Sequence, residues 1–211
     1  GNLKDAYYVF KSYWGKEPFA YIESHTWTER QGPKNKSRNV SVFSNCSKVE
    51  LFLNDKSLGT KEKNVKIFPA SGLNWDVPFI KGKNKLKAIG YNTSNNASAK
   101  DTLTINYRFK KNKKAKKLKS SYKILKNGNY LITATAVDKD GLRCLDYNNR
   151  VYFQCLEGGQ AIVSHGTPTG SESIEMANGK ASIEVIRTTP KKPLKVLVIN
   201  QNFKGDYLTI N

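Results

Sequence analysis

The sequence has 211 residues with 36 lysines and arginines against 17 aspartates and glutamates, which gives a formal net charge of +19. A chain of this length can form one large domain or two domains of roughly 100 residues each. It contains no apolar run of about 20 residues, so a transmembrane helix is excluded. It also lacks the pattern of a signal peptide. Because the chain starts at Gly1 in the middle of a pattern, we expect a fragment whose export signal, if any, lies upstream.

The first predicted element is a short helix. Apolar and aromatic side chains recur at helical spacing along one face, namely Leu3, Ala6, Tyr7, Phe10 and Trp14. Two further tyrosines lie off this stripe, so the helix would expose aromatic surface unless a larger body covered it. The alternative is that the helix packs on the strands that follow it.

A polar and aromatic cluster comes after the next predicted strand and contains Glu23, His25, Trp27, Glu29 and Arg30. A histidine between two carboxylates is a residue set that acid–base catalysis uses. The spacing does not fix how these side chains meet, and a domain interface has the same composition. Glu23, His25, Trp27 and Arg30 are therefore candidates for contacts with carbohydrate or with a neighbouring domain.

Central strands are predicted around Val40–Val42 and Val49–Leu53, where apolar and polar residues alternate. Asn54–Lys56 predicts a tight turn, because Asn and Asp tolerate left-handed backbone angles. Alternation resumes at Leu73–Phe79 and places Trp75 in the core. Strands that follow one another at this spacing, without intervening helices, are typical of antiparallel sandwiches.

Pro78 interrupts the alternating pattern, and proline cannot donate to a central ladder, so this strand is predicted to lie at a sheet edge or to end there. Further strands around Leu86–Tyr91 and Leu103–Tyr107 complete the first half.

The second half predicts another set of strands with no helix between them. They cover Ser120–Leu125, Tyr130–Asp138, Leu142–Leu145, Val151–Leu156, Gln160–Ser164, Lys180–Arg187, Leu194–Asn200 and Asp206–Ile210. Asn127–Gly128, Asp140–Gly141 and Asn178–Gly179 are typical of hairpin turns. Asp138–Gly141 resembles the start of a calcium loop but lacks the remaining oxygen ligands, so a turn is expected. His165–Gly170 is predicted to be a loop.

The three cysteines, Cys46, Cys144 and Cys155, allow at most one internal disulfide. Cys144 and Cys155 lie on predicted strands and can face each other. The alternative, which we favour, is that all three are buried thiols. Without a CxxC motif or a His–Cys cluster, neither a zinc site nor any other metal or cofactor site is expected.

The basic run from Arg108 to Lys119 separates the two strand-rich halves. Blocks of like charge repel one another and stay extended, which predicts a solvated linker. A strongly basic chain can also bind nucleic acid. This run lacks the interleaved aromatic residues and the recognition helix that specific binding would use, so no specific nucleic-acid partner is expected.

Several motifs resemble the C-terminal part of family 2 glycoside hydrolases, the β-galactosidase-like enzymes of polysaccharide-degrading bacteria. They are DAYYVFKSYW, YIESHTW, VSVFSNCSKVELFLNDKSLGT, FPASGLNWDVPF, NGNYLITATAVDKDGLRCLDYNNRVYFQC and HGTPTGSESIEMANGKASIEV. The resemblance covers nearly the whole chain. Its motifs are architectural, and none of them is catalytic.

This resemblance implies an all-β fold of two immunoglobulin-like antiparallel β-sandwiches in tandem, with a short N-terminal helix. Residues 1–17 would be the remnant of the last helix of the catalytic barrel and residues 18–107 the first sandwich. Residues 108–119 would be the basic linker and residues 120–211 the second sandwich. The catalytic barrel of the same parent chain would then be the partner of this region.

The function implied by the resemblance is structural support of a glycosidase barrel, without catalytic residues in this chain and without a cofactor. The parent enzyme would hydrolyse O-glycosyl bonds in carbohydrate metabolism and would be periplasmic or secreted. A carbohydrate-binding module, in which Trp27 stacks on a sugar ring, is the first alternative. A basic nucleic-acid-binding protein is the second.

Overall fold

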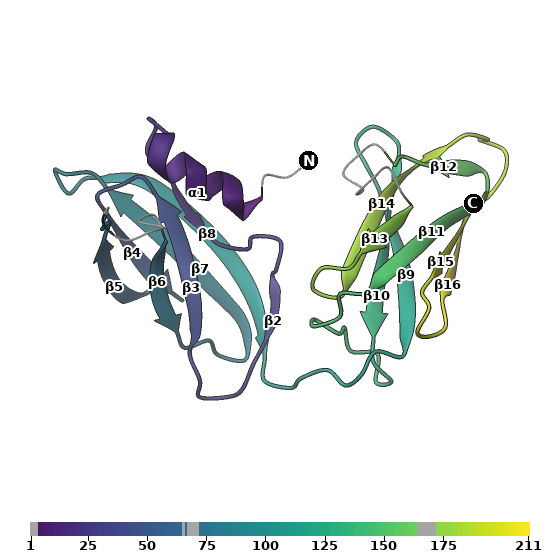
Figure 1. Cartoon of the computed structure of the whole chain (residues 1–211), viewed down its shortest axis with the longest axis horizontal. Helices are drawn as coiled ribbons and strands as arrows, with labels where there is room; N and C mark the ends of the chain where they lie inside the picture. The colour runs from purple at the N-terminus through teal and green to yellow at the C-terminus, as the bar shows by residue number, and fades with distance from the viewer. Residues whose placement is uncertain (1–3, 65, 67–71, 164–171) are drawn as a thin grey trace. The chain divides into compact units, whose positions relative to one another are not determined.

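The computed structural model describes residues 4–64, 66, 72–163 and 172–211. The chain divides into two compact units, residues 2–111 and residues 112–211, which we call the N-terminal unit and the C-terminal unit. Both units consist mainly of β-strands (Figure 1). Within the described ranges the helix α1 (Asp5–Trp14) is the sole α-helix. The predicted all-β sandwich fold with a short N-terminal helix is therefore confirmed.

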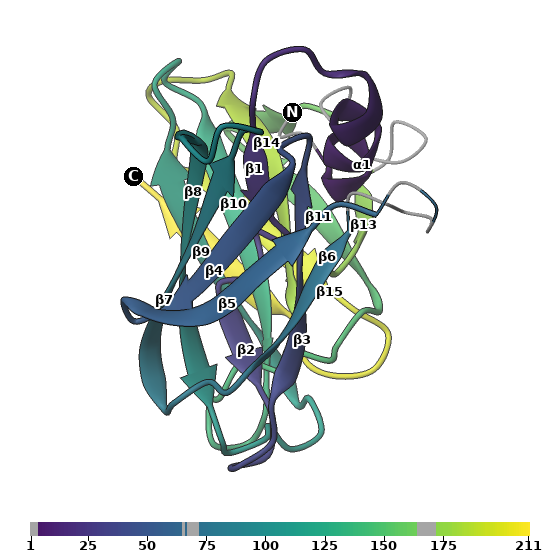
Figure 2. The same cartoon turned by 90° about the vertical axis from the view of Figure 1, so that its left-hand side faces the viewer.

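The N-terminal unit contains two sheets. The smaller sheet has the strand order β1 (Ala20–Ile22), β3 (Arg38–Ser44) and β6 (Leu73–Val77). The larger has the order β2 (Glu29–Gln31), β8 (Ala97–Arg108), β7 (Gly82–Tyr91), β4 (Lys48–Leu53) and β5 (Lys56–Glu62). All neighbours are antiparallel except β2 and β8, which run parallel. The strands of this unit are labelled in Figure 2.

The core of the N-terminal unit is one cluster to which both sheets contribute. Its buried members from the smaller sheet include Val40, Val42 and Trp75, and those from the larger sheet include Leu51 and Leu86. Because alternate residues of a strand point to the same face, the period-2 pattern of the sequence becomes the inner face of each sheet. The predicted core position of Trp75 is confirmed, since its side chain is 3% exposed.

Local turn chemistry also agrees with the prediction in this unit. Asn54 and Asp55 both have positive φ, 50° and 65°, and they connect β4 to β5. β6 ends at Val77, directly before Pro78, and it lies at the edge of its sheet. A proline without an N–H therefore stands where no ladder hydrogen bond is required.

The C-terminal unit contains two four-stranded antiparallel sheets. One has the order β12 (Gly159–Ala161), β14 (Lys180–Arg187), β10 (Tyr130–Val137) and β9 (Lys117–Ile124). The other has the order β13 (Ser173–Glu175), β11 (Arg150–Glu157), β15 (Leu194–Ile199) and β16 (Asp206–Ile210). Residues from both sheets, such as Ile132, Ile183, Phe153 and Val196, share one buried cluster.

The basic run differs from the expected solvated linker over its second half. Ala115 and Leu118 are 8% and 2% exposed and belong to the core cluster of the C-terminal unit. The strand β9 already begins at Lys117. The two apolar side chains in this half of the run, Ala115 and Leu118, dock on the C-terminal sandwich, while the lysines between them keep their charges in solvent.

Other strand predictions are only partly correct. Leu142–Leu145 is not a strand. Instead, the Asp138 carboxylate accepts the N–H groups of Asp140 and Leu142 and turns the chain there. The short strands β2 and β13 were not predicted, because three residues are too few to show a period. The predicted loop His165–Gly170, the end of the predicted strand at Ser164 and Leu3 of the helical stripe lie outside the described residues.

Candidate functional site

The predicted cluster lies in and around the loop of residues 23–28, which connects β1 to β2. Ser24 has a positive φ of 60°. Its N–H donates to Asp5 Oδ2 of α1 at 2.8 Å, and Trp27 N–H donates to Ser24 O at 2.9 Å. The helix and a local turn therefore hold this loop in one conformation.

His25 pairs with a carboxylate that the sequence did not indicate. Its Nε2 lies 2.7 Å from Asp101 Oδ2, which comes from β8. The same oxygen accepts the N–H of Ile22 at 2.7 Å. The imidazole also stacks on the ring of Tyr21, with ring centroids 4.6 Å apart. Because 76 residues separate His25 from Asp101, no local spacing could reveal the pair.

The two glutamates of the cluster are bound to different parts of the unit. Glu23 Oε1 accepts the N–H of Ser41 at 2.9 Å. Both carboxylate oxygens of Glu29 accept from Asn106 Nδ2, at 3.2 and 3.0 Å. Each glutamate thus satisfies a polar group on a neighbouring strand, and the acid–base arrangement around His25 that the sequence suggested does not involve them.

Arg30 holds the backbone of the loop. Its Nε donates to Trp27 O at 3.1 Å, and one terminal nitrogen donates to Glu23 O at 3.3 Å. Burial lowers the pKa of Arg30, and the nearby Glu23 carboxylate opposes this effect. The indole of Trp27 remains 48% exposed. Trp27 is therefore the member of the predicted set whose ring is open to a ligand.

A stack of rings ties α1 to the same region. Tyr8 stacks on Tyr21 with centroids 3.5 Å apart and planes 7° apart. Tyr21 Oη donates to Asp5 Oδ1 at 2.9 Å. Burial, and then the Asp5 carboxylate, raise the pKa of Tyr21 well above its ordinary value. Through these contacts and the His25–Asp101 pair, the cluster connects α1, β1 and β8.

The helix α1 has two aromatic faces. Tyr8 and Val9 pack on the small cluster of Phe19, Tyr21 and Phe43. The other face carries Phe10 and Trp14, whose rings stack with centroids 5.4 Å apart and planes 4° apart. These two side chains are 55% and 74% exposed. The described residues of the predicted stripe, from Ala6 to Trp14, are therefore on the exposed face, and the sandwich is covered by residues beside that stripe.

The part of the chain that the structure describes has three cysteines and few clustered metal-ligating side chains. It contains no group of three or more His, Cys, Asp or Glu side chains that could hold a metal ion. No helix in the described ranges is long and apolar enough to span a membrane. All three cysteines are thiols; Cys46 and Cys144 are buried and Cys155 is half-buried. The Cys144 thiol donates to Lys113 O.

Several proteins that are similar to this chain in sequence or structure are named beta-glucuronidases. A putative beta-glucuronidase from Formosa agariphila is 65% identical over 210 residues, which is 100% of this chain and 25% of that protein. The crystal structure of Parabacteroides merdae beta-glucuronidase is 32% identical and has a TM-score of 0.87. It matches 98% of this chain and 26% of that one. The chain is homologous to a region of family 2 glycoside hydrolases.

Other comparisons agree with this relationship. The beta-glucuronidase 3 structure from Bacteroides uniformis has a TM-score of 0.86 and 32% identity, over 100% of this chain and 27% of that chain. Residues 35–99 match the family described as DUF4982, a domain of unknown function. The chain thus spans about a quarter of the length of these family 2 relatives. These relatives are named beta-glucuronidases, so the β-galactosidase-like part of the expectation stays a prediction.

Proposed function

We propose that this chain is a non-catalytic β-sandwich region of a family 2 glycosidase with glucuronidase-type substrates, and that it braces the catalytic barrel. The observation that carries this proposal is the two-sided helix α1. One face of the helix is fixed to the sandwich, while Phe10 and Trp14 present a stacked aromatic pair outward. The relatives are about four times as long as this chain, so they contain a body that can cover this pair.

The energy available from such a contact is large enough to matter. Covering roughly 200 Å² of aromatic surface contributes about 5 kcal/mol before the cost of ordering the partner. Exposed aromatic pairs of this kind mark interaction sites more commonly than isolated exposed side chains do. The residues 1–17 would then be shared between the barrel and the first sandwich, rather than belonging to the barrel alone.

The absence of catalysis in this chain is part of the proposal. Retaining glycosidases use two carboxyl groups about 5 Å apart, on either side of the scissile bond. In the best candidate cluster, Glu23 and Glu29 are bound to Ser41 and Asn106, and Asp101 is bound to His25. The purified chain should release no nitrophenol from β-glucuronide, β-galactoside or β-mannoside reporters above a buffer blank. Turnover that a Glu23→Gln or Glu29→Gln variant abolishes would overturn this part.

The bracing role is tested with a double variant, Phe10→Ser with Trp14→Ser, made both in this chain and in the parent enzyme. Both side chains are largely exposed here, so the melting temperature of the 211-residue chain should change little. The parent enzyme should melt several degrees lower, because the covered pair would leave a cavity at the barrel. Trp27→Ser is the matched control, because Trp27 is an exposed aromatic residue on the same unit. If the parent enzyme and its double variant had the same melting temperature, the proposed contact would be excluded.

A carbohydrate-binding module remains the second candidate, since the half-exposed Trp27 ring can stack on a sugar. Titration with oligosaccharides, followed by tryptophan fluorescence, separates the two: a module responds to sugar and loses the response in Trp27→Ala.

The proposed parent enzyme would act in the periplasm or outside the cell.

A further inference from the structure

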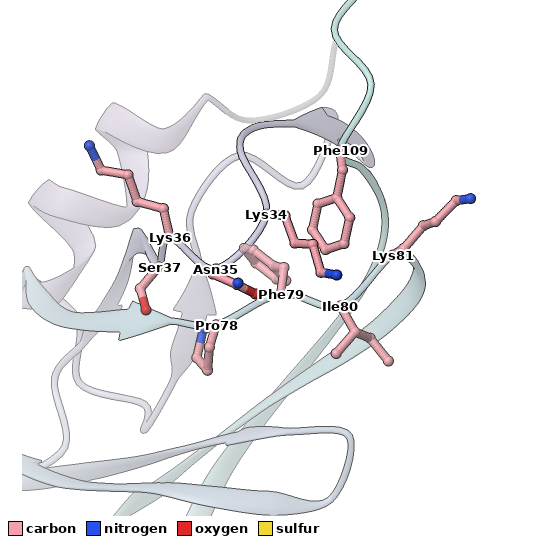
Figure 3. A pocket seen from close by; sticks show the side chains of 9 residues that line it. All are labelled: Lys34, Asn35, Lys36, Ser37, Pro78, Phe79, Ile80, Lys81 and Phe109. Carbon is pink, nitrogen blue, oxygen red and sulfur yellow. The ribbon is translucent and has the colours of Figure 1, made fainter.

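The N-terminal unit carries a pocket of about 360 Å³ that lies apart from the predicted cluster (Figure 3). Three segments line it. They are residues 34–37 before β3, residues 78–81 between β6 and β7, and Phe109 after β8. The parallel pairing of β2 with β8 brings the first and third segments together, and Gly32 N–H donates to Arg108 O at 3.1 Å.

The side chain of Asn84 fixes the backbone of the segment 78–81. This side chain is fully buried, and its Oδ1 accepts the N–H of Ile80 at 2.9 Å. Its Nδ2 donates to the carbonyl oxygens of Ile80 and Gly82, both at 2.8 Å. A buried amide with this many partners is costly to disturb. These hydrogen bonds fix the backbone at Ile80, from which the side chain extends into solvent.

The inner surface of the pocket is apolar and backed by rings. Phe79 is buried and stacks on Tyr107 with centroids 5.0 Å apart. Phe109 meets Tyr107 edge to face at 6.0 Å. Ile80, in contrast, is 56% exposed at the mouth of the pocket. An exposed apolar side chain beside a ring is the kind of surface against which the C–H face of a sugar ring packs.

The rim of the pocket is cationic. Lys34, Lys36 and Lys81 are all exposed, and no carboxylate side chain lines the pocket. Among the described residues, none of these lysines forms an ion pair. Figure 3 shows Lys34 beside the Phe109 ring, with Lys36 and Lys81 extending away on the two sides. Unpaired ammonium groups around an apolar surface attract a ligand that carries negative charge.

We propose that this pocket binds an acidic saccharide. A pyranose ring would pack against Ile80 and Phe109, and a carboxylate or sulfate on that sugar would contact the ammonium group of Lys34. Lys36 and Lys81, which extend to either side (Figure 3), would add to the positive potential around the pocket. The charge and the apolar surface come from the pocket itself, whereas the choice of a saccharide over another anion rests on the proposed function. The site would hold a polymeric substrate near the parent enzyme without taking part in its chemistry.

The test is calorimetric titration of the 211-residue chain, at low ionic strength, with a hexasaccharide of alternating glucuronate and N-acetylgalactosamine. We expect the triple variant Lys34→Gln, Lys36→Gln, Lys81→Gln to bind at least about tenfold more weakly, since each exposed charge pair contributes a fraction of a kcal/mol up to about 1 kcal/mol. Ile80→Ser should also weaken binding several-fold. The matched controls lie on the C-terminal unit: Lys123→Gln with Lys126→Gln and Lys191→Gln for charge, and Ile124→Ser for an equally exposed isoleucine. Both controls should bind as the wild type does.

Two further ligands test whether binding requires both the negative charge and the sugar ring. The same hexasaccharide with its carboxylates reduced to hydroxymethyl groups should bind far more weakly, and polyglutamate of similar charge should bind more weakly than the acidic sugar. The proposal is overturned if the wild-type chain does not bind the hexasaccharide, if the control lysines matter as much as the pocket lysines, or if either comparison ligand binds equally well. None of these variants touches α1, so a failure here leaves the bracing test in the parent enzyme intact.

Discussion

The imidazole of His25 and the carboxylate of Asp101 are joined by a 2.7 Å contact between Nε2 and Oδ2. That oxygen also accepts the N–H of Ile22, a residue whose side chain is fully buried. A single carboxylate therefore fastens β1 and the loop after it to β8. Through this contact, the histidine of the predicted cluster links the loop after β1 to β8.

Asp101→Ala should lower the free energy of unfolding of the chain by about 1–3 kcal/mol, because a buried backbone N–H loses its acceptor. Urea unfolding followed by tryptophan fluorescence measures this change. His25→Ala should cost less, since Ile22 keeps its partner in that variant. Equal stability of the Asp101 variant and the wild type would show that Ile22 finds another acceptor.

Limited trypsin digestion should cut early after Lys110 and Lys111 and spare the bonds that follow Lys116 and Lys117. The second half of the basic run is fixed, because Lys116 N–H donates to Val137 O at 2.8 Å and Leu118 is buried. Trypsin cleaves where the backbone is mobile, so the part of the run that packs on the C-terminal unit should be protected. Mass spectrometry of the first fragments identifies the sites. Rapid cutting along the whole run would favour the solvated linker expected from the sequence.

The Asp138 carboxylate should make the stability of the C-terminal unit dependent on pH. Oδ2 accepts Lys113 N–H at 2.9 Å, and Oδ1 accepts the N–H groups of Asp140 and Leu142 at 3.0 and 2.9 Å. These bonds, that of Lys113 first, lower the pKa of Asp138 below its ordinary value. Its stabilisation is therefore present above the ordinary pKa of about 4 and is lost as the pH falls through the lower pKa of the folded state.

Asp138→Asn should consequently destabilise the chain at about pH 6 and less at about pH 2.5, because below the ordinary pKa of about 4 the wild type progressively loses this stabilisation. Urea unfolding at both pH values measures the difference. Asp146→Asn provides a comparison, because that carboxylate accepts one side-chain donor, Asn112 Nδ2. An Asp138 effect that is the same at both pH values would contradict the role of its charge.

The thiol of Cys155 should react slowly with Ellman's reagent at neutral pH. Burial, and then the Glu172 carboxylate, raise the pKa of Cys155 to about 11. At pH 8 the thiolate fraction is then about 100-fold smaller than for an ordinary cysteine, and the thiolate is the nucleophile. The rate should rise about tenfold for each pH unit up to pH 10. A Cys155→Ser variant identifies the reacting residue, and fast reaction of the folded wild type near pH 7 would contradict the raised pKa.

Local rules were sufficient to predict most strands. The alternation that places Trp75 and its neighbours inside the first sandwich depends only on the two-residue repeat of a β-strand. The turn at Asn54 and Asp55 depends on the tolerance of these residues for positive φ. Such features are properties of a few consecutive residues, so they can be predicted before any long-range contact is known. The motifs that indicated family 2 glycoside hydrolases are of the same local kind.

Long-range packing decided the remaining features. The sequence indicated neither that His25 meets Asp101, nor that Phe109 joins Lys34 and Ile80 around one pocket. It also predicted a solvated linker where Ala115 and Leu118 are buried, because a run dominated by like charges contains two apolar side chains that pack into a core. Contacts between residues tens of positions apart depend on how sheets pair and pack. By itself the sequence determined which faces are apolar, and the tertiary structure decided what each face meets, because burial is a property of the assembled sheets and not of a single strand.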